Sequence, residues 1–249
     1  MRKLQPLSST DAGQSGPTRP REPATCRVTG YPVAVAIGTA ALVACLAILP
    51  GPLMPSLATY ALLVAVLPRL IRHFYPHPAF GACNTITLAR AAMTLALLAP
   101  LASGEGGGRL VAGIAALALL LDGLDGWLAR RSGLVSAFGA RFDMEVDSAL
   151  ALIMSLHLLS AGRTGGEILI LGFARPVFMF ASWVFPWIGR PLPQRFRRKA
   201  ICVLQLATLL VLQLPVADDP AFDWLARIAA GFLLWSFATD ILWLRRHRQ

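Results

Sequence analysis

The sequence has little charge for its length. Only 14% of its 249 residues are Asp, Glu, Lys or Arg, while 56% are hydrophobic. A soluble domain carries about 25% charged residues. Cysteine is also scarce, since the four cysteines lie far apart and form no pair with the spacing of a metal site. These shortages argue against a soluble domain and against a metal–sulfur or disulfide site, and they indicate a chain whose solvent is lipid.

Long apolar segments take the place of charge. A helix that crosses a bilayer needs about 20 mostly apolar residues, and no segment has the pattern of a strand. We therefore predict an all-α, polytopic transmembrane helix bundle. Its eight expected spans are residues 32–49, 54–71, 84–102, 109–130, 137–161, 166–187, 198–215 and 221–244.

The basic residues gather in alternate links between these spans. The net charge is +10, and with the N-terminus in the cytosol the opposite-side links hold only Arg109 and Arg163 of the basic residues. Cytosolic links of membrane proteins show this excess of Lys and Arg. Because the basic residues form no continuous stripe, nucleic-acid binding is not expected. We predict an integral membrane protein, in a bacterial inner membrane, with both termini and its active site facing the cytosol.

The chain begins with a polar segment, residues 1–30, that is rich in Pro, Ser, Thr and Arg. Such a composition predicts a disordered tail. No clear cleavage site follows the first apolar run, so we expect that run to be a retained helix.

Carboxylates are the least expected residues inside apolar spans. Asp122 and Asp125 lie three residues apart, and Asp143 and Asp147 lie four apart, so each pair shares a helix face. In an antiparallel hairpin that turns near residue 134, the two pairs lie at equal depths. A charge at the centre of a span costs about 2.5–3.5 kcal/mol, and four carboxylates at one depth repel one another. We predict that divalent cations with a preference for oxygen ligands, Mg²⁺, Mn²⁺ or Ca²⁺, bind between them.

Two other interpretations of these carboxylates remain open. Internal arginines can neutralise them, and Arg90, Arg141 and Arg175 are the candidates. Intramembrane carboxylates also line ion pathways in transporters and channels. The matched depths, together with glycines beside the cluster, favour the metal site.

The spacing of the motif is similar to a family signature. The fixed residues are Asp122, Asp125, Gly126, Ala129 and Arg130, then, after eight residues, Gly139, Asp143 and Asp147. This pattern resembles the signature of the CDP-alcohol phosphatidyltransferase family, class I and bacterial-type, at every fixed position. The resemblance covers about residues 76–249 and implies a six-helix catalytic domain. Residues 31–75 are then an extra N-terminal transmembrane hairpin, preceded by the tail 1–30.

The resemblance implies a role for each motif residue. It implies phospholipid biosynthesis with two Mg²⁺ per site, Mn²⁺ being the alternative. Asp143 would bridge the metals and Asp147 would also be the general base. The metal ligands would be Asp122, Asp125, Asp143 and Asp147. The CDP moiety would be bound by Gly126, Ala129, Arg130 and Gly139 and, through an Asn-x-x-Thr-x-x-Arg pattern, by Asn84 and Thr87. Asn84 has a simpler interpretation as a helix cap.

The implied partners are CDP-diacylglycerol, a small polar alcohol and membrane lipids. The family is often dimeric, which allows a homodimer. We favour glycerol 3-phosphate as the acceptor because Arg141, Arg175 and Lys199 are basic residues able to form a pocket for its phosphate. Alternatively, Arg175 pairs with Glu145. Inositol, inositol phosphate, serine and choline remain open as acceptors. Headgroup transfer from CDP-choline or CDP-ethanolamine to diacylglycerol is the alternative reaction, and a non-catalytic scaffold is a third interpretation.

Overall fold

The computed structural model describes residues 28–104, 108–162, 165–185, 187–188, 196–214 and 221–246. In this part of the chain, the prediction of an all-α fold is confirmed, and an isolated bridge between Thr29 and Ala79 is the only extended pairing found there. The helices are α1 (Tyr31–Leu46), α2 (Met54–Phe74), α3 (Gly81–Ala96), α4 (Leu98–Ala102), α5 (Arg109–Ser132), α6 (Ala137–Ser160), α7 (Glu167–Val184), α8 (Phe196–Leu212) and α9 (Ala221–Arg246). Most of the predicted tail, residues 1–27, lies outside the described residues.

Five stretches of helix are long and apolar enough to cross a membrane. They are α2, the stretch 81–102 that contains α3 and α4, α5, α7 and the stretch 222–246 of α9. Helices α1 and α8 are apolar but shorter. Helix α6 has 24 residues and carries three carboxylates in its first half. The protein is therefore a polytopic membrane protein, while eight spans and a six-helix core stay predictions.

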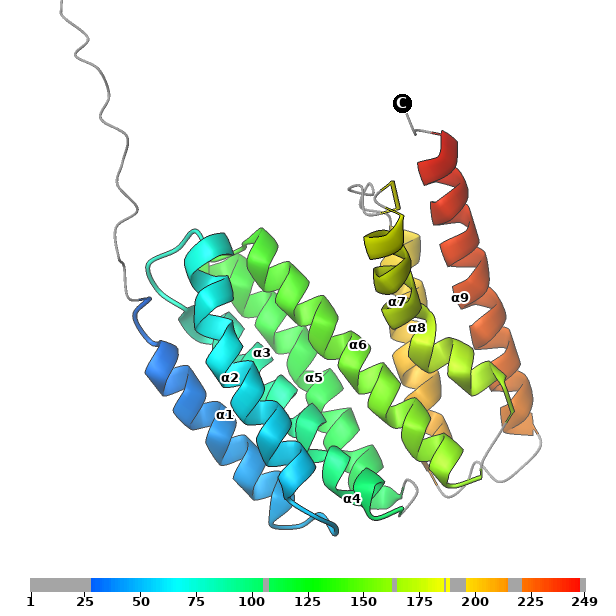
Figure 1. Ribbon diagram of the computed structural model, residues 1–249, viewed down its shortest axis with the longest axis horizontal. Helices are drawn as coiled ribbons and strands as arrows, with labels where there is room; N and C mark the ends of the chain where they lie inside the picture. Colours follow the sequence, from blue (N-terminus) through cyan, green and yellow to red (C-terminus); the bar gives the residue numbers. More distant parts are fainter. Residues whose placement is uncertain are drawn as a thin grey trace, which may run out of the picture.

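Helix α3 lies at the centre of the N-terminal part of the bundle. It packs against α1, α5 and α6 (Figure 1). Within the stretch 81–102, 67% of the most apolar window is buried, whereas the corresponding share in α7 is 17%. Helices α7, α8 and α9 form a second group, which α6 joins through its contacts with α7 and α8. A polar residue on α3 is consequently shielded from both lipid and water.

The single predicted span 84–102 is broken into α3 and α4 at Leu97. Proline has no backbone N–H, so Pro100 leaves the carbonyl of Ala96 without its helical donor. The hydroxyl of Ser56 on α2 donates to that carbonyl at 3.3 Å. The adjacent carbonyl of Leu97 lies 2.9 Å from Nε2 of His157 on α6. The break is therefore stabilised by side chains from two neighbouring helices.

The hairpin of α1 and α2 occupies the predicted range 31–75, although its status as a separate unit stays a prediction. Its turn fits closely against the end of the α3–α4 stretch. Gly51 has a φ of 110°, and a Cβ there would lie 2.2 Å from the carbonyl oxygen of Ala99. Only glycine satisfies both the backbone angle and the close approach. The hairpin turn is thus packed tightly onto α4, which follows the helix that carries Arg90.

The turn between α5 and α6 is set by two local signals. Gly133 ends α5 in the left-handed conformation, with a φ of 67°. Ser136 then caps α6, and its hydroxyl accepts a hydrogen bond from the backbone N–H of Gly139 at 3.0 Å. The chain reverses direction between these residues, so that carboxylates of α5 and α6 come close together.

Candidate active site

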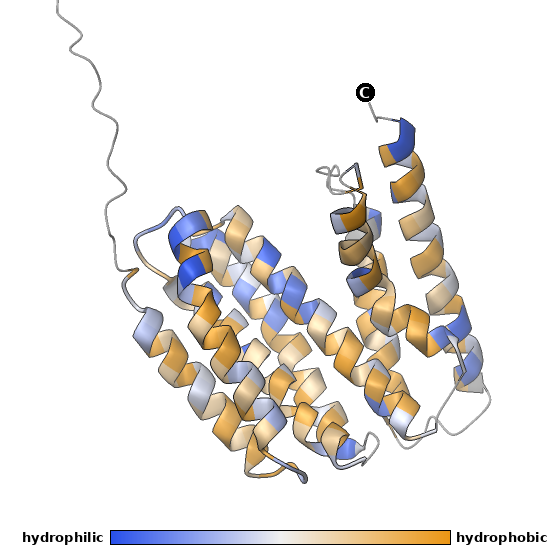
Figure 2. Cartoon of the chain, in the orientation of Figure 1, coloured by the Kyte–Doolittle hydropathy of each residue, from blue (hydrophilic) through white to orange (hydrophobic). Residues whose placement is uncertain are grey.

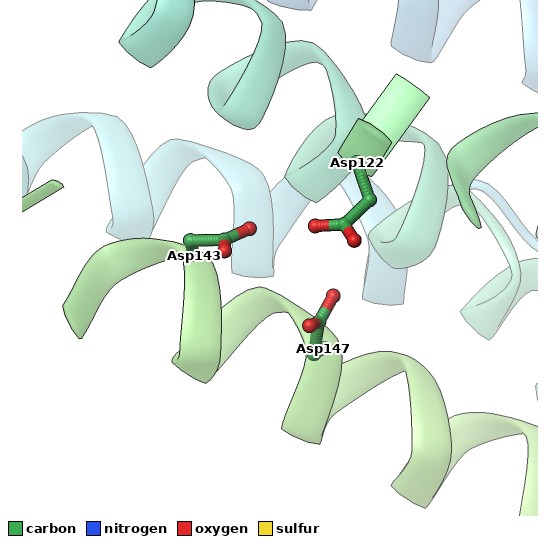
Figure 3. A group of neighbouring side chains, drawn as sticks. All are labelled: Asp122, Asp143 and Asp147. Carbon is green, nitrogen blue, oxygen red and sulfur yellow. The ribbon is translucent and has the colours of Figure 1, made fainter. Parts of the chain in front are cut away.

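Helices α5 and α6 bring their aspartates together. One carboxylate oxygen from each of Asp122, Asp143 and Asp147 lies within 4.8 Å of the others. Figure 3 shows the three side chains pointing toward a common space between the two helices. Asp125, one turn from Asp122, is only 5% exposed and completes the group through a shared partner on α3. The convergence that the sequence spacing predicts is present in the structure.

Arg90 on α3 is that shared partner. Its Nη1 lies 2.9 Å from Asp122, 2.8 Å from Asp125 and 2.5 Å from Asp143. Its Nη2 lies 2.5 Å from Asp147. Its Nε donates to the carbonyl of Ala118 at 3.0 Å, and the side chain is fully buried. The sequence analysis named Arg90 as a neutralising arginine, and the structure places it in contact with all four aspartates.

The donor set fits divalent cations. Carboxylate oxygens are the ligands that Mg²⁺ and Mn²⁺ prefer. One guanidinium balances one of the four aspartate charges, which leaves three negative charges at the edge of a low-dielectric medium. Asp122 and Asp143 keep 37% and 34% of their side-chain surface exposed, so cations can reach the cluster. Arg90 and bound cations therefore share the task of neutralising this site.

The last two turns of α5 carry the residues predicted to bind the nucleotide. Arg130 is exposed, and its Nη1 lies 3.4 Å from the place that a Cβ would take at Gly126. A side chain at position 126 would crowd this guanidinium. Ala129 is half-buried beside it. On α6, a Cβ at Gly139 would lie 3.1 Å from Oδ1 of Asn84, so the start of α6 passes close to α3.

Thr87 and Asn84 occupy different environments on α3. The Thr87 hydroxyl donates to Oδ2 of Asp125 at 3.0 Å, which places it behind the aspartate cluster. Asn84 lies in the first turn, and its Nδ2 donates to the carbonyl of Phe80 at 2.7 Å. The N-cap position belongs to Phe80, without a side-chain cap. The interpretation of Asn84 as a helix cap is therefore wrong, since a cap accepts from backbone N–H groups.

A family model described as CDP-alcohol phosphatidyltransferase matches residues 80–241. The chain belongs to this family. The match begins just before α3 and ends within α9, so it includes Arg90 and all four aspartates and leaves out the α1–α2 hairpin. No curated protein and no solved structure matches the chain.

Membership of the CDP-alcohol phosphatidyltransferase family establishes the class of chemistry. The protein is an integral membrane enzyme of phospholipid synthesis that transfers a substituted phosphate group from a CDP-alcohol to an alcohol. Enzymes of this family depend on metal ions, which agrees with the aspartate triad. The individual roles assigned to the motif residues stay predictions, as do the donor and the acceptor.

Two of the three basic residues predicted for an acceptor pocket, Arg141 and Arg175, have side chains within the described structure. Arg175 on α7 forms an ion pair with Glu145 on α6, with 2.9 Å between Nη2 and Oε1. Arg141 is exposed on α6. The side chain of Lys199 lies outside the described residues. Nε of Arg175 is buried without a hydrogen-bond partner in the described structure.

Tyr75 is the residue near the site that the sequence analysis did not single out. It lies in the link between α2 and α3, and its hydroxyl accepts a hydrogen bond from Nδ2 of Asn84 at 3.0 Å. Tyr75 precedes the matched residues and belongs to no motif, so only the folded structure reveals the contact.

Proposed function

We propose that the protein transfers the phosphatidyl group of CDP-diacylglycerol to glycerol 3-phosphate and releases CMP. The observation that carries this proposal is the convergence of Asp122, Asp143 and Asp147, with Arg130 two turns further along α5. The combination of a carboxylate cluster and an arginine further along the same helix suits a donor that carries a diphosphate, which supports the proposal. We further propose that the protein lies in a bacterial inner membrane and that its active site faces the cytosol.

Asp122, Asp125, Asp143 and Asp147 would hold two Mg²⁺. These ions, when bound, supply positive charge that stabilises the diphosphate and the departing CMP. Asp143 would help to hold these ions, because its carboxylate faces those of Asp122 and Asp147 in the triad (Figure 3). Thr87 and Arg90 orient Asp125 by donating to its Oδ2.

Asp147 would accept the proton of the acceptor hydroxyl. Arg90 donates to its Oδ1, so Oδ2 is the oxygen that would take the proton. The oxygen of the acceptor then forms a bond to the phosphorus that carries diacylglycerol. The bond from that phosphorus to the CMP oxygen breaks, and CMP leaves. Holding both substrates in line contributes to the rate by removing the entropy cost of their encounter.

Arg130 would contact the diphosphate from the end of α5. Its exposed guanidinium lies over Gly126, where the absence of a side chain lets an anion approach. An arginine binds a phosphate through two parallel N–H donors, which fixes orientation as well as charge. The diacylglycerol chains would extend between helices toward the surrounding lipid.

Arg175 is the basis for favouring a phosphorylated acceptor. Its side chain is positively charged and 33% exposed, so an anionic acceptor can approach it. A specific observation also favours a second candidate. The ion pair with Glu145 neutralises Arg175, which suits an uncharged or zwitterionic acceptor such as inositol or serine. The two candidates differ in whether that pair opens when the acceptor binds.

The test is CMP release by the purified protein in detergent with Mg²⁺ and CDP-diacylglycerol. Glycerol 3-phosphate, inositol, inositol phosphate, serine and choline are supplied one at a time. We expect release with glycerol 3-phosphate, and none after chelation or in Asp147→Asn. Release with inositol or serine instead would establish the second candidate. Release only from CDP-choline or CDP-ethanolamine with diacylglycerol would overturn the donor assignment.

A further inference from the structure

The link between α2 and α3, residues 75–80, is tied to the start of the N-terminal hairpin. The backbone N–H of Thr29 donates to the carbonyl of Pro78 at 2.9 Å, and that of Phe80 donates to the carbonyl of Thr29 at 3.0 Å. The ring of Tyr31 meets the ring of Phe80 edge-on, with 5.6 Å between centroids. The residues at the start of α1 therefore hold the end of this link, next to the first residue of α3.

The same link contacts the turn between α5 and α6. The ring of Tyr75 meets Phe138 edge-on at 5.6 Å. His77 lies with Nε2 3.4 Å from the carbonyl of Val135. A Cβ at Gly81 would lie 2.3 Å from Cδ1 of Leu134, so the two segments are in close contact. The turn contacted here joins Arg130 to Gly139, which are two of the residues predicted to bind CDP.

The hydroxyl of Tyr75 fixes the side-chain amide of Asn84. It lies 2.8 Å from the carbonyl of Ala79 and 3.2 Å from that of Phe80, and it accepts from Nδ2 of Asn84. That nitrogen also donates to the carbonyl of Phe80 at 2.7 Å. Both amide hydrogens therefore have partners, and Oδ1 faces the start of α6 at Gly139. Burial raises the pKa of the Tyr75 phenol, which keeps it protonated at neutral pH.

We infer that Tyr75 is a positioning residue for the nucleotide. By fixing Asn84, it presents Oδ1 as a hydrogen-bond acceptor beside Gly139 for an N–H or O–H donor of the cytidine, either the base amino group or a ribose hydroxyl. The inference rests on the proposed function only in placing the nucleotide at this turn. It gives the α1–α2 hairpin a part in substrate binding, because Tyr75 lies outside the residues 80–241 that match the family.

The amide orientation matters because its two ends have opposite hydrogen-bonding character. If Asn84 rotated by half a turn, its NH₂ group would face Gly139, and a donor on the nucleotide would meet another donor. In Tyr75→Phe the amide nitrogen loses one of its two acceptors, so the orientation is no longer fixed. The ring packing against Phe138 is retained by the substitution, so the fold is preserved.

The experiment is calorimetric titration of CMP into the full-length protein in detergent with Mg²⁺. The variants are Tyr75→Phe, Asn84→Ala and the double variant, with Tyr60→Phe as the matched control. Tyr60 is also a buried tyrosine of the hairpin region, but its hydroxyl donates to the carbonyl of Val35, within the hairpin. We expect Tyr75→Phe to raise the CMP Kd about three- to tenfold, as loss of one hydrogen bond does. Tyr60→Phe should leave it unchanged.

Further readouts separate positioning from a structural role. The double variant should bind CMP no more weakly than Asn84→Ala, because both residues act through one oxygen. Tyr75→Phe should raise the KM for the CDP-alcohol without lowering kcat. The base of UMP has no amino group. If Oδ1 of Asn84 binds the amino group of cytosine, Tyr75→Phe should leave the Kd for UMP unchanged. If Oδ1 binds a ribose hydroxyl, Tyr75→Phe should raise the Kd for UMP as it does for CMP.

An unchanged CMP Kd in Tyr75→Phe would overturn the inference, as would a lower Tm with unchanged binding or additive losses in the double variant. CMP is a product of every CDP-alcohol reaction, so this test is independent of the acceptor. Wild-type protein that binds no CMP would overturn the proposed function as well. If the wild type binds CMP and Tyr75→Phe binds it with the same Kd, only the inference about Tyr75 is overturned.

Discussion

At the scale of single residues, Arg90 neutralises part of the negative charge of the aspartate cluster before substrate binds. Its planar guanidinium donates to Asp125, Asp143, Asp147 and the carbonyl of Ala118, and it forms an ion pair with Asp122 as well. A lysine has neither the reach nor the geometry. Because Arg90 is fully buried, removing it leaves carboxylates without their fixed cation in a medium that solvates charge poorly.

We expect Arg90→Gln to depend on metal for stability. Loss of one partner of a buried ion pair costs about 3–5 kcal/mol, so in EDTA the Tm should fall well below that of the wild type. Mg²⁺ should restore more of the Tm in the variant than it adds to the wild type, because bound cations take over the charge balance. Arg131→Gln, which removes an exposed arginine lying over Trp127, is the control. Equal Tm values for Arg90→Gln and wild type in EDTA would contradict this role.

The ion pair of Arg175 and Glu145 leads to a prediction about the acceptor. We expect Arg175→Gln to raise the KM for glycerol 3-phosphate roughly tenfold or more, since a hydrogen bond to a charged group contributes about 1.5–3 kcal/mol. The KM for CDP-diacylglycerol should stay constant. Arg227→Gln is the matched control, because Arg227 pairs with Glu167 at 3.5 Å on the α7–α9 side. A constant KM for glycerol 3-phosphate in Arg175→Gln would remove this residue from the acceptor site.

At the scale of elements, the α5–α6 hairpin shows what a sequence can predict. Helix periodicity places Asp122 with Asp125, and Asp143 with Asp147, on single faces, and a short turn makes their depths equal. The convergence therefore follows from spacing alone. The contact of Arg90 with all four does not, because it depends on how α3 packs between its neighbours. The position of Tyr75 against Asn84 likewise depends on tertiary packing across a helix end.

The break between α3 and α4 has a local signal in the sequence. Pro100 lies in the predicted span 84–102, and its missing N–H makes an interruption near residue 97 expected. The sequence does not show which side chains bind the carbonyls of Ala96 and Leu97 at this break. Ser56 and His157 come from helices 40 and 60 residues away along the chain.

Close packing between α6 and α7 gives a prediction at this scale. A Cβ at Gly172 would lie 2.5 Å from Cβ of Ser155, which no rotation of the serine relieves. We expect Gly172→Ala to lower the Tm, because overpacking a tight contact costs about 1–3 kcal/mol. Gly231→Ala on α9 meets nothing within 4 Å and should keep or raise the Tm through its better helix propensity. A Tm for Gly172→Ala equal to that of Gly231→Ala would show that the two helices are not packed this closely.

At the scale of the whole molecule, polar residues gather at one end of the bundle. Arginines occupy the last turns of α2, α5 and α9. These helix ends lie on the same side of the molecule, where hydrophilic colouring is strong in α2 (Figures 1 and 2). The arrangement supports the proposed orientation, with this end in the cytosol. It also supports the prediction that the α1–α2 hairpin adds two membrane crossings. An even number of added crossings leaves the active site on the cytosolic side.

Cysteine labelling checks this topology. In a background that carries Cys26→Ser and Cys202→Ser, Ser132→Cys at the end of α5 should react with a membrane-impermeant thiol reagent in inside-out vesicles only. Ser103→Cys, after α4, should react in right-side-out vesicles only. Both serines are exposed, and Cys45 and Cys83 are buried, so the background signal is low. The reverse pattern would place the active site on the outer face.

We propose above that the aspartates of α5 and α6 form a centre for two divalent metals. The most direct measurement is a titration of the purified protein with Mn²⁺, with free Mn²⁺ counted by electron paramagnetic resonance in the presence of CMP. We predict two bound Mn²⁺ per wild-type chain, and loss of tight binding in Asp143→Asn. Binding that is absent in the wild type, or unchanged in Asp143→Asn, would contradict the account.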